Sequence, residues 1–371
     1  MFAVKFAAMN LSQDRNWNNL ICALPNAHVL QTAEWGEFKR RSTGWTPDQI
    51  ILRDEREAVI GAALSLTRRM GPLAVMYVPK GPMLEYRDPL AVEQMLERLE
   101  SAARQNRAIW LKIDPDVIAG TGIPGDPDAA DDLVGQQVVT ALKRRGWRFS
   151  DSQVQFHNTI NVDLTRSEDD LLAAMGQGKR RKVRYGPKHG VSVRAATVDD
   201  LPLLYALYVE TGRRDGFLTR PYNYYADEWG AMMRAGLAHA LIAEVNNAAV
   251  GHVILFHFGR KCWYFYGASI NDVDMRRLMP SDLLQWEAMR WAKAHGYATY
   301  DMWGAPDEFR EDSPMWGVFQ FKRDFGGTIT RHIGAWDYAP SAALYALYTK
   351  IMPRVLDVMR GRGRRSVTKQ D

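Results

Sequence analysis

Residues 239–266 read HALIAEVNNAAVGHVILFHFGRKCWYFY, and this stretch decides the fold class. Residues 239–245 and 250–258 are mostly apolar runs of strand length, and residues 262–266 form a third. Asn246 and Asn247 separate the first two runs, and asparagine tolerates the positive φ that a tight hairpin turn requires. The stretch therefore predicts three strands, of which the first two form an antiparallel hairpin.

A helix and one more strand follow this hairpin. Pro280 and Ser281 indicate a helix start, with Ser281 as the N-cap, and Gly296 directly after His295 indicates its end. Residues 298–302 then form an apolar run that predicts the returning strand. Three strands, a helix and a strand therefore make one structural unit.

The same order of elements occurs earlier in the chain, with Gly61 and Gly251 in equivalent places. A duplication explains this recurrence, and coincidence among short strands is the alternative. Such units are typical of GNAT-type acyltransferase lobes, so the predicted fold class is α+β, with two GNAT-like domains and mixed sheets flanked by helices. The earlier strands, helix and returning strand are predicted at residues 49–52, 58–66, 73–78, 89–105 and 108–113.

Length and composition agree with two soluble domains. The 371 residues exceed the ~250 to 300 that one hydrophobic core supports, and 46% of them are hydrophobic. The 48 Lys and Arg against 43 Asp and Glu give a net charge of +5, which permits a polyanionic partner. The chain has two cysteines, Cys22 and Cys262, which lie far apart in sequence without a C-x-x-C motif, so a disulfide framework and a zinc module are both excluded. Without an apolar run of spanning length or a signal peptide, we expect a cytoplasmic protein.

A GNAT enzyme that uses acyl-CoA needs a glycine-rich turn before the central helix, where backbone N–H groups hold the pyrophosphate. Residues 276–281 and 84–89 occupy that place in the two units, and neither contains a glycine. We therefore expect that any acyl donor is not CoA.

A basic segment joins the two units. In a helix these cations would point all around the axis, so we expect most of them to contact water or a polyanion, to whose phosphates such a cluster would bind in a salt-sensitive way. A solvated surface run is the alternative. The expected RNA-binding residues are Lys179, Arg180, Arg181, Lys182 and Arg184, and a second basic run closes the chain at Arg360, Arg362, Arg364, Arg365 and Lys369.

Aromatic residues accompany two further cations. Strand alternation predicts Tyr264 and Tyr266 on one face of residues 262–266 and Trp263 and Phe265 on the other, so that one pair would belong to the core and the other could line a cleft. Arg220 precedes Pro221, so it belongs to a loop or a helix start and could clamp a phosphate or a carboxylate, a surface salt bridge being the alternative. Lys322 stands among phenylalanines that would hold its ammonium in an aromatic pocket, although a snorkelling surface lysine explains the same pattern. These phenylalanines are Phe319, Phe321 and Phe325.

Seven short motifs together resemble the Fem transferases, which are the aminoacyltransferases that build peptidoglycan interpeptide bridges. The resemblance runs from about residue 28 to about residue 338. The motifs are Gln31-Thr32-Ala33-Glu34-Trp35 with Lys39, Lys80-Gly81-Pro82, Asp114-Pro115, Thr219-Arg220-Pro221, Trp263-Tyr264-x-Tyr266, Tyr300-Asp301-x-x-Gly304 and Phe321-Lys322-x-x-Phe325-Gly326-Gly327.

The resemblance implies a domain division and a reaction that uses no CoA or other cofactor and no metal. The precursor-binding domain would comprise residues 1–155 and about 328–371, because the C-terminal segment folds back, and residues 156–327 would form the aminoacyl-tRNA side. The reaction would transfer an amino acid from aminoacyl-tRNA to the stem-peptide side-chain amine of a UDP-linked or lipid-linked peptidoglycan precursor. A GNAT-like N-acyltransferase with another donor, acting on a protein or a polysaccharide precursor, is the alternative. An RNA-binding module without activity would account only for the basic segments.

The same resemblance implies roles for individual residues. Lys39, Arg220 and Tyr224 would hold the diphosphate and sugar of the precursor, and Trp110 would line its cleft together with Tyr264. Tyr266 would lie near the peptide or the acyl donor. Lys322 with Phe321 would act at the aminoacyl end of the tRNA, where an ammonium offsets phosphate or oxyanion charge.

This chain departs from the family in two places. It lacks the coiled-coil insertion of some members, and residues 120–132 form an insertion-like loop without an assigned role. We expect the protein to be a monomer. We also expect the attacking amine of the precursor to lose its proton to a group of the substrates. A lipid-linked acceptor would add peripheral contact with the inner face of the plasma membrane.

Overall fold

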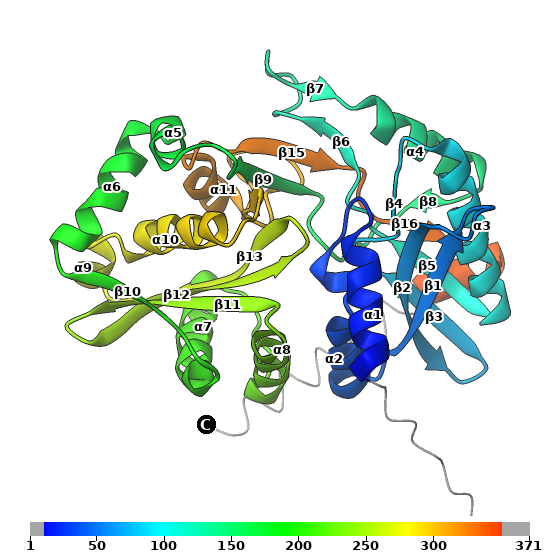
Figure 1. The fold of residues 1–371 in the computed structure, drawn as a ribbon, viewed down its shortest axis with the longest axis horizontal. Helices are drawn as coiled ribbons and strands as arrows, with labels where there is room; N and C mark the ends of the chain where they lie inside the picture. The colour runs from blue at the N-terminus through cyan, green and yellow to red at the C-terminus, as the bar shows by residue number, and fades with distance from the viewer. Residues whose placement is uncertain (1–10, 351–371) are drawn as a thin grey trace, which may run out of the picture.

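The computed structural model describes residues 11–350, which form two mixed sheets flanked by helices (Figure 1). The seven-stranded first sheet has the order β1 (Thr46–Arg53), β2 (Val59–Met70), β3 (Leu73–Val78), β5 (Ala108–Ile113), β16 (Trp336–Tyr338) and β8 (Arg148–Phe149), with β4 (Met83–Leu84) paired to β2. The nine-stranded second sheet has the order β10 (Val191–Ala195), β11 (Ala238–Val245), β12 (Ala248–Phe258), β13 (Lys261–Ser269), β14 (Thr299–Asp301), β9 (Asn158–Asp163), β15 (Thr328–His332), β6 (Ile118–Thr121) and β7 (Ala130–Asp131).

The duplicated order of elements is present in both sheets. In each, two antiparallel pairings are followed by a parallel one: β3 with β5, and β13 with β14. The crossovers carry α3 (Pro89–Gln105) and α10 (Pro280–Ala294). All the predicted strands and both predicted helices occur, which confirms the α+β fold class with mixed sheets.

Local signals at the chain turns are mostly confirmed. Asn246 and Asn247 both have positive φ, 50° and 63°, in the hairpin between β11 and β12. Gly296, with φ of 81°, follows the end of α10. The predicted N-cap Ser281 is wrong, because Pro280 is already the first helical residue and Met279, with φ of 61°, holds the cap position. Proline suits that first position since it has no N–H to leave unpaired.

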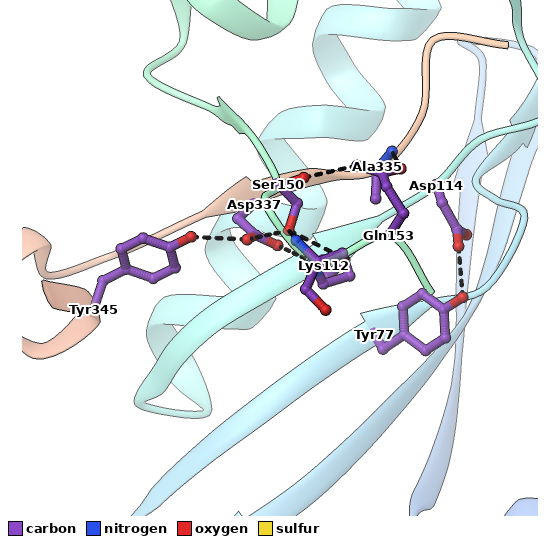
Figure 2. A network of polar contacts seen from close by, with 9 residues as sticks. Tyr77, Lys112, Asp114, Ser150, Gln153, Ala335, Asp337 and Tyr345 are labelled. Carbon is purple, nitrogen blue, oxygen red and sulfur yellow. Dashed lines mark hydrogen bonds and ion pairs between the residues drawn. The ribbon is translucent and has the colours of Figure 1, made fainter. Parts of the chain in front are cut away.

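Strand pairing crosses the predicted domain boundaries. The insertion-like loop supplies β6 and β7, and β6 pairs with β15 at the end of the second sheet. The chain then returns to the first sheet, where β16 pairs with β5 and β8. Figure 2 shows the polar network that fastens this return. Lys112 Nζ lies 2.9 Å from Asp337 Oδ1, and the other carboxylate oxygen accepts hydrogen bonds from Ser150 Oγ at 2.7 Å and Tyr345 OH at 2.8 Å.

Three apolar cores hold these layers together. One lies between the first sheet and the pair α3 and α4 (Leu133–Arg144). Another lies between the second sheet and α5 (Glu168–Ala174), α6 (Gln177–Lys188), α10 and α11 (Trp316–Arg323). The third is shared by both sheets and by α1 (Leu11–Cys22), α2 (Ala33–Thr43), α7 (Leu201–Asp215) and α8 (Tyr222–Arg234). This shared core brings α2 of the first half against α8 of the second (Figure 1).

The remaining helix of this region, α9 (Val273–Arg277), precedes α10. None of the helices within residues 11–350 combines the length and apolar character that a membrane span requires. The basic run at Arg360 to Lys369 lies outside the described residues.

Candidate active site

The junction of α2 and α8 brings together three of the predicted substrate residues. Lys39 on α2 donates a hydrogen bond from Nζ to Tyr224 OH, at 3.2 Å. The same ammonium lies over the ring of Trp35, 4.5 Å from its centroid. The Arg220 guanidinium lies 4.5 Å from the centroid of the Tyr224 ring. Two cations from opposite halves of the chain therefore share one tyrosine, which is a suitable arrangement for binding an anion of two charges.

Local structure holds these side chains in place. Thr32 caps α2 by accepting a hydrogen bond from the Trp35 N–H, which sets the direction of the helix that carries Lys39. Arg220 lies in the loop before α8, as predicted. Its carbonyl accepts a hydrogen bond from Tyr205 OH at 3.1 Å, while its side chain stays exposed. The backbone at Arg220 is thus anchored and the guanidinium remains accessible.

Sequence reasoning missed a buried carboxylate beneath this pair of cations. Glu228 lies one helical turn beyond Tyr224 and accepts a hydrogen bond from Tyr266 OH at 2.6 Å. Burial raises the pKa of Glu228, and the charge of Lys39 opposes that rise. Burial lowers the pKa of Lys39, with Glu228 acting against the change and Arg220 adding to it. Spacing of four residues from Tyr224 on one helix face was the signal that could have found Glu228.

The predicted common face of Tyr264 and Tyr266 is wrong. A β-bulge interrupts the pairing of β12 with β13, so that Ile254 faces Tyr266 while Leu255 faces Tyr264. The extra residue, Phe265, reverses the alternation of side chains from that point. Tyr266 consequently packs in the shared core near Glu228, whereas Tyr264 packs on the opposite face of the sheet.

Lys322 lies on that opposite face and contacts backbone rather than phenylalanine rings. Its side chain is buried, and Nζ donates hydrogen bonds to the carbonyls of Trp303 at 2.5 Å and Gly304 at 2.8 Å. Burial lowers its pKa to about 7, against the opposing charge of Asp301. Trp303 has φ of 49°, uncommon for a residue with a side chain, and its N–H donates to Asp301 Oδ1. Lys322 and Asp301 together hold this turn, and Lys322 also lies 5.6 Å from the Tyr264 ring.

The aromatic pocket predicted for Lys322 holds a different lysine. Lys179 Nζ lies 3.9 Å from the ring centroid of Phe321 and 4.3 Å from that of Phe325. Its side chain is 1% exposed and forms an ion pair with Asp282 at 2.8 Å. The prediction that Lys179 faces solvent or RNA is therefore wrong. It belongs to the buried side of α6, because α6 packs against α10 and presents one face to the core.

The other cations of α6 lie outward. Arg181 and Arg184 are exposed, and Arg180 and Lys182 are half-buried. A surface depression on this helix is lined mainly by cationic side chains, with one aromatic ring among them. Its lining residues include Arg180, Arg181, Arg184, Tyr185 and Lys188.

Trp110 lies away from the Lys39 group. Its ring contacts Tyr348 at 6.2 Å between centroids, and Lys112 Nζ lies 5.7 Å from it. Trp110 and Lys112 lie two residues apart on one face of β5, with Tyr348 beside Trp110, so the structure does not bring Trp110 together with Arg220.

Two of the short motifs, Lys80-Gly81-Pro82 and Asp114-Pro115, meet in a polar group between the sheets. In the same group, the carboxylate oxygens of Asp116 lie 2.6 Å from Lys261 Nζ and 3.1 Å from His332 Nε2. Burial would raise the pKa of Asp116, but these two partners hold it well below its usual range. Nearby, Asp114 accepts hydrogen bonds from Tyr77 OH and the Lys80 N–H, and burial raises its pKa to about 6.

Comparison with known proteins agrees with this architecture. The model of the FemAB family matches residues 14–250 and 231–352. The chain belongs to the FemAB family. The resemblance to Fem transferases drawn from the seven motifs is thereby confirmed.

Curated relatives of this FemAB-family chain include two that are named lipid II:glycine glycyltransferase. The protein from Staphylococcus haemolyticus (strain JCSC1435) is 26% identical, with 94% of this chain and 96% of that protein covered. The one from Staphylococcus aureus (strain USA300) is also 26% identical, with 89% and 92% covered.

Solved structures show the same fold. The crystal structure of FemX has a TM-score of 0.79 at 24% identity, with 90% of this chain and 98% of that one covered. A tandem GNAT protein from the clavulanic acid biosynthesis pathway has a TM-score of 0.51 at 15% identity, with coverage of 90% and 98%. The prediction of two GNAT-like units is consistent with both.

Proposed function

We propose that this FemAB-family protein transfers an amino acid from aminoacyl-tRNA to the stem-peptide side-chain amine of a lipid-linked peptidoglycan precursor. The observation that carries the proposal is the meeting of Lys39 and Arg220 at one tyrosine, in a chain related over nearly its whole length to lipid II:glycine glycyltransferases. Lipid II glycyl transfer builds a peptidoglycan bridge, so the same class of acceptor is expected here.

In this proposal the two cations bind the diphosphate of the precursor. Arg220 offers a planar fork of N–H donors, and Lys39 adds a compact charge across the junction of the two halves. Tyr224 fixes both, since its hydroxyl accepts from Lys39 and its ring lies beneath the guanidinium. Tyr266, held by Glu228, completes the wall of this site.

The chemistry requires little more than positioning. The stem-peptide amine attacks the ester carbonyl of the aminoacyl-tRNA, a C–N bond forms, and the C–O bond to the terminal ribose breaks. The attacking ammonium must first lose a proton, and the leaving ribose oxygen takes one up. Substrate-assisted transfer between these two groups would balance the reaction without a protein nucleophile.

In its protonated form Lys322 has one donor left for this reaction. An ammonium carries three N–H donors, and the carbonyls of Trp303 and Gly304 occupy two. The third could stabilise the oxyanion that develops on the ester carbonyl, or a terminal phosphate of the tRNA. Phe321, which is half-buried with Lys179 against its ring, would then support the aminoacyl end.

The outward cations of α6 would bind the tRNA backbone. Arg181 and Arg184 are exposed, whereas Lys179 anchors the same helix through Asp282. Exposed cations on a fixed helix favour phosphate binding that weakens with salt. The residues proposed to contact the tRNA are therefore Arg180, Arg181, Lys182 and Arg184, without the buried Lys179.

The test is a transfer assay with a mass readout. The protein is incubated with glycyl-tRNA, or with a pool of charged tRNAs, and with lipid-linked or UDP-linked precursor. A precursor heavier by one amino acid residue is expected only when the tRNA is charged. Product formed from acyl-CoA but not from charged tRNA would overturn the proposal in favour of a GNAT-like N-acyltransferase.

A further inference from the structure

The connection between α7 and α8, residues 216–221, carries an unusually exposed apolar tip. Leu218 is 95% exposed, and Phe217 next to it is 39% exposed. Single exposed apolar residues are common on soluble proteins. Two adjacent ones at the end of a loop are different. The Phe217 ring packs partly against Tyr208, 5.3 Å between centroids, and its exposed part and Leu218 lose contact with water only if another apolar phase meets the loop.

Hydrogen bonds and close packing hold the start of this loop against α7. Gly216 has φ of 78° and ends α7, and the N–H groups of Gly216 and Phe217 both donate to the Gly212 carbonyl. Gly212 allows close packing here, since a Cβ at this residue would lie 2.8 Å from Thr219 Cγ2. These contacts leave Leu218 pointing away from the protein.

Two arginines flank the apolar tip in the sequence. Arg213 and Arg220 are exposed on either side of it. The one acid of this turn, Asp215, is neutralised by Arg214 at 2.7 Å. An apolar tip between arginines is typical of segments that lie in the interface of an anionic membrane, where apolar residues enter the acyl boundary and cations meet the headgroups.

The loop also adjoins the proposed diphosphate site. Arg220 is two residues from Leu218, and its guanidinium stacks on Tyr224 beside Lys39. In a lipid-linked precursor the diphosphate joins the sugar to the lipid tail, so it lies at the membrane surface. A protein that binds this diphosphate with Arg220 must bring the loop to the same depth.

We propose that residues 216–221 dock on an anionic membrane by inserting Leu218 and Phe217, which places Arg220 at the level of the lipid-linked acceptor's diphosphate. This inference rests on the proposed function for its choice of acceptor. The docking itself depends only on the loop.

Vesicle binding and transfer are measured with the full chain. Vesicles contain equal amounts of phosphatidylglycerol and phosphatidylcholine, and the variant is Leu218→Ser. The matched control is Leu90→Ser, on α3 of the other half, where the leucine is 66% exposed. We expect Leu218→Ser to weaken vesicle binding by about 10-fold or more, as loss of one buried leucine implies, and Leu90→Ser to bind like the wild type.

Two acceptors separate docking from chemistry. Leu218→Ser should lose transfer to the lipid-linked precursor in vesicles and keep wild-type transfer to the soluble UDP-linked form. Equal vesicle binding by Leu218→Ser and the wild type overturns the docking proposal, even if transfer is seen. Docking that depends on Leu218, without transfer to either acceptor, overturns the proposed function and leaves the membrane surface assigned.

Discussion

Two groups of cations in this molecule lie against aromatic rings, yet their charges are compensated differently. Lys39 and Arg220 meet at the junction of the two halves, with the carboxylate of Glu228 behind them and the guanidinium open to solvent. Lys179 and Lys322 lie inside the second half and are fully buried. The first group keeps unused donors for a ligand, whereas the second is held within the protein, Lys179 by its ion pair with Asp282 and Lys322 by two backbone carbonyls. Aromatic surroundings alone therefore do not distinguish a binding cation from a structural one.

The largest expected effect tests the structural side of this comparison. Asp282→Ala leaves the buried Lys179 without its partner, which should lower the free energy of unfolding by about 3 to 5 kcal/mol. Urea denaturation measures the change. Asp274→Ala removes the exposed partner of Arg277 and should cost no more than about 1 kcal/mol. Similar losses in both variants would show that Lys179 is not held as a buried ion pair.

Arg220 tests the binding side. Arg220→Ala should raise the dissociation constant for the UDP-linked precursor roughly 10- to 100-fold, since charge-assisted hydrogen bonds to a phosphate are lost, while stability stays unchanged. Calorimetric titration measures the constant. Arg41→Ala, which removes an exposed arginine of α2, serves as the control. An unchanged constant for Arg220→Ala would refute the clamping role.

Lys322 is buried like Lys179 but also has a proposed role in transfer, and the pH dependence of stability tests its burial. Its pKa is about 7 in the folded protein against 10.5 for an ordinary lysine. Between these values the unfolded chain binds a proton that the folded protein lacks, so the lysine's contribution to stability rises with pH. Relative to Lys322→Met, the wild type should gain about 2 kcal/mol from pH 7 to pH 9 in urea denaturation.

Transfer by Lys322→Met should also fall at least ~10-fold, with precursor binding retained, as loss of one transition-state contact implies. A stability difference that does not change with pH would contradict the lowered pKa. Turnover like that of the wild type would contradict the proposed role in transfer.

The smallest effect concerns Tyr266. Tyr266→Phe removes the donor to Glu228 Oε1 and should cost about 1 kcal/mol of stability, more at pH 8 than at pH 5 because the ionised carboxylate is the better acceptor. Thermal unfolding at the two pH values measures it. Tyr185→Phe on the exposed side of α6 should be neutral. A loss that is the same at both pH values would mean that Glu228 does not change its protonation state between them.

The two β-rich units could be predicted because their signals are local. Buried strands are apolar along their length, and residues such as Asn246 and Asn247 mark the turn between them. Helix ends follow equally short signals, as Gly296 shows after α10. The error at Ser281 came from two residues that can both begin a helix, of which the proline took the first place.

Long-range contacts could not be read in the same way. Lys179 and Asp282 lie on different helices, so no local pattern predicts that one cation of the basic run turns inward. The single-residue bulge at Phe265 depends on the pairing of β13 with β12. The spacing from Tyr224 to Glu228 is a local signal, but the hydrogen bond from Tyr266 to Glu228 depends on how β13 packs against α8.

By itself, the sequence determined the order of strands and helices, the family, and the set of cations that compete for functional roles, because these depend on residue type and on short spacings. Only the tertiary structure decided which cations remain available to a ligand. Lys39 and Arg220 keep free donors at the junction of the two halves, while Lys179 is neutralised within the core. The physical reason is that burial and pairing depend on neighbours far away in sequence, and these determine whether a charge binds a ligand or the protein itself.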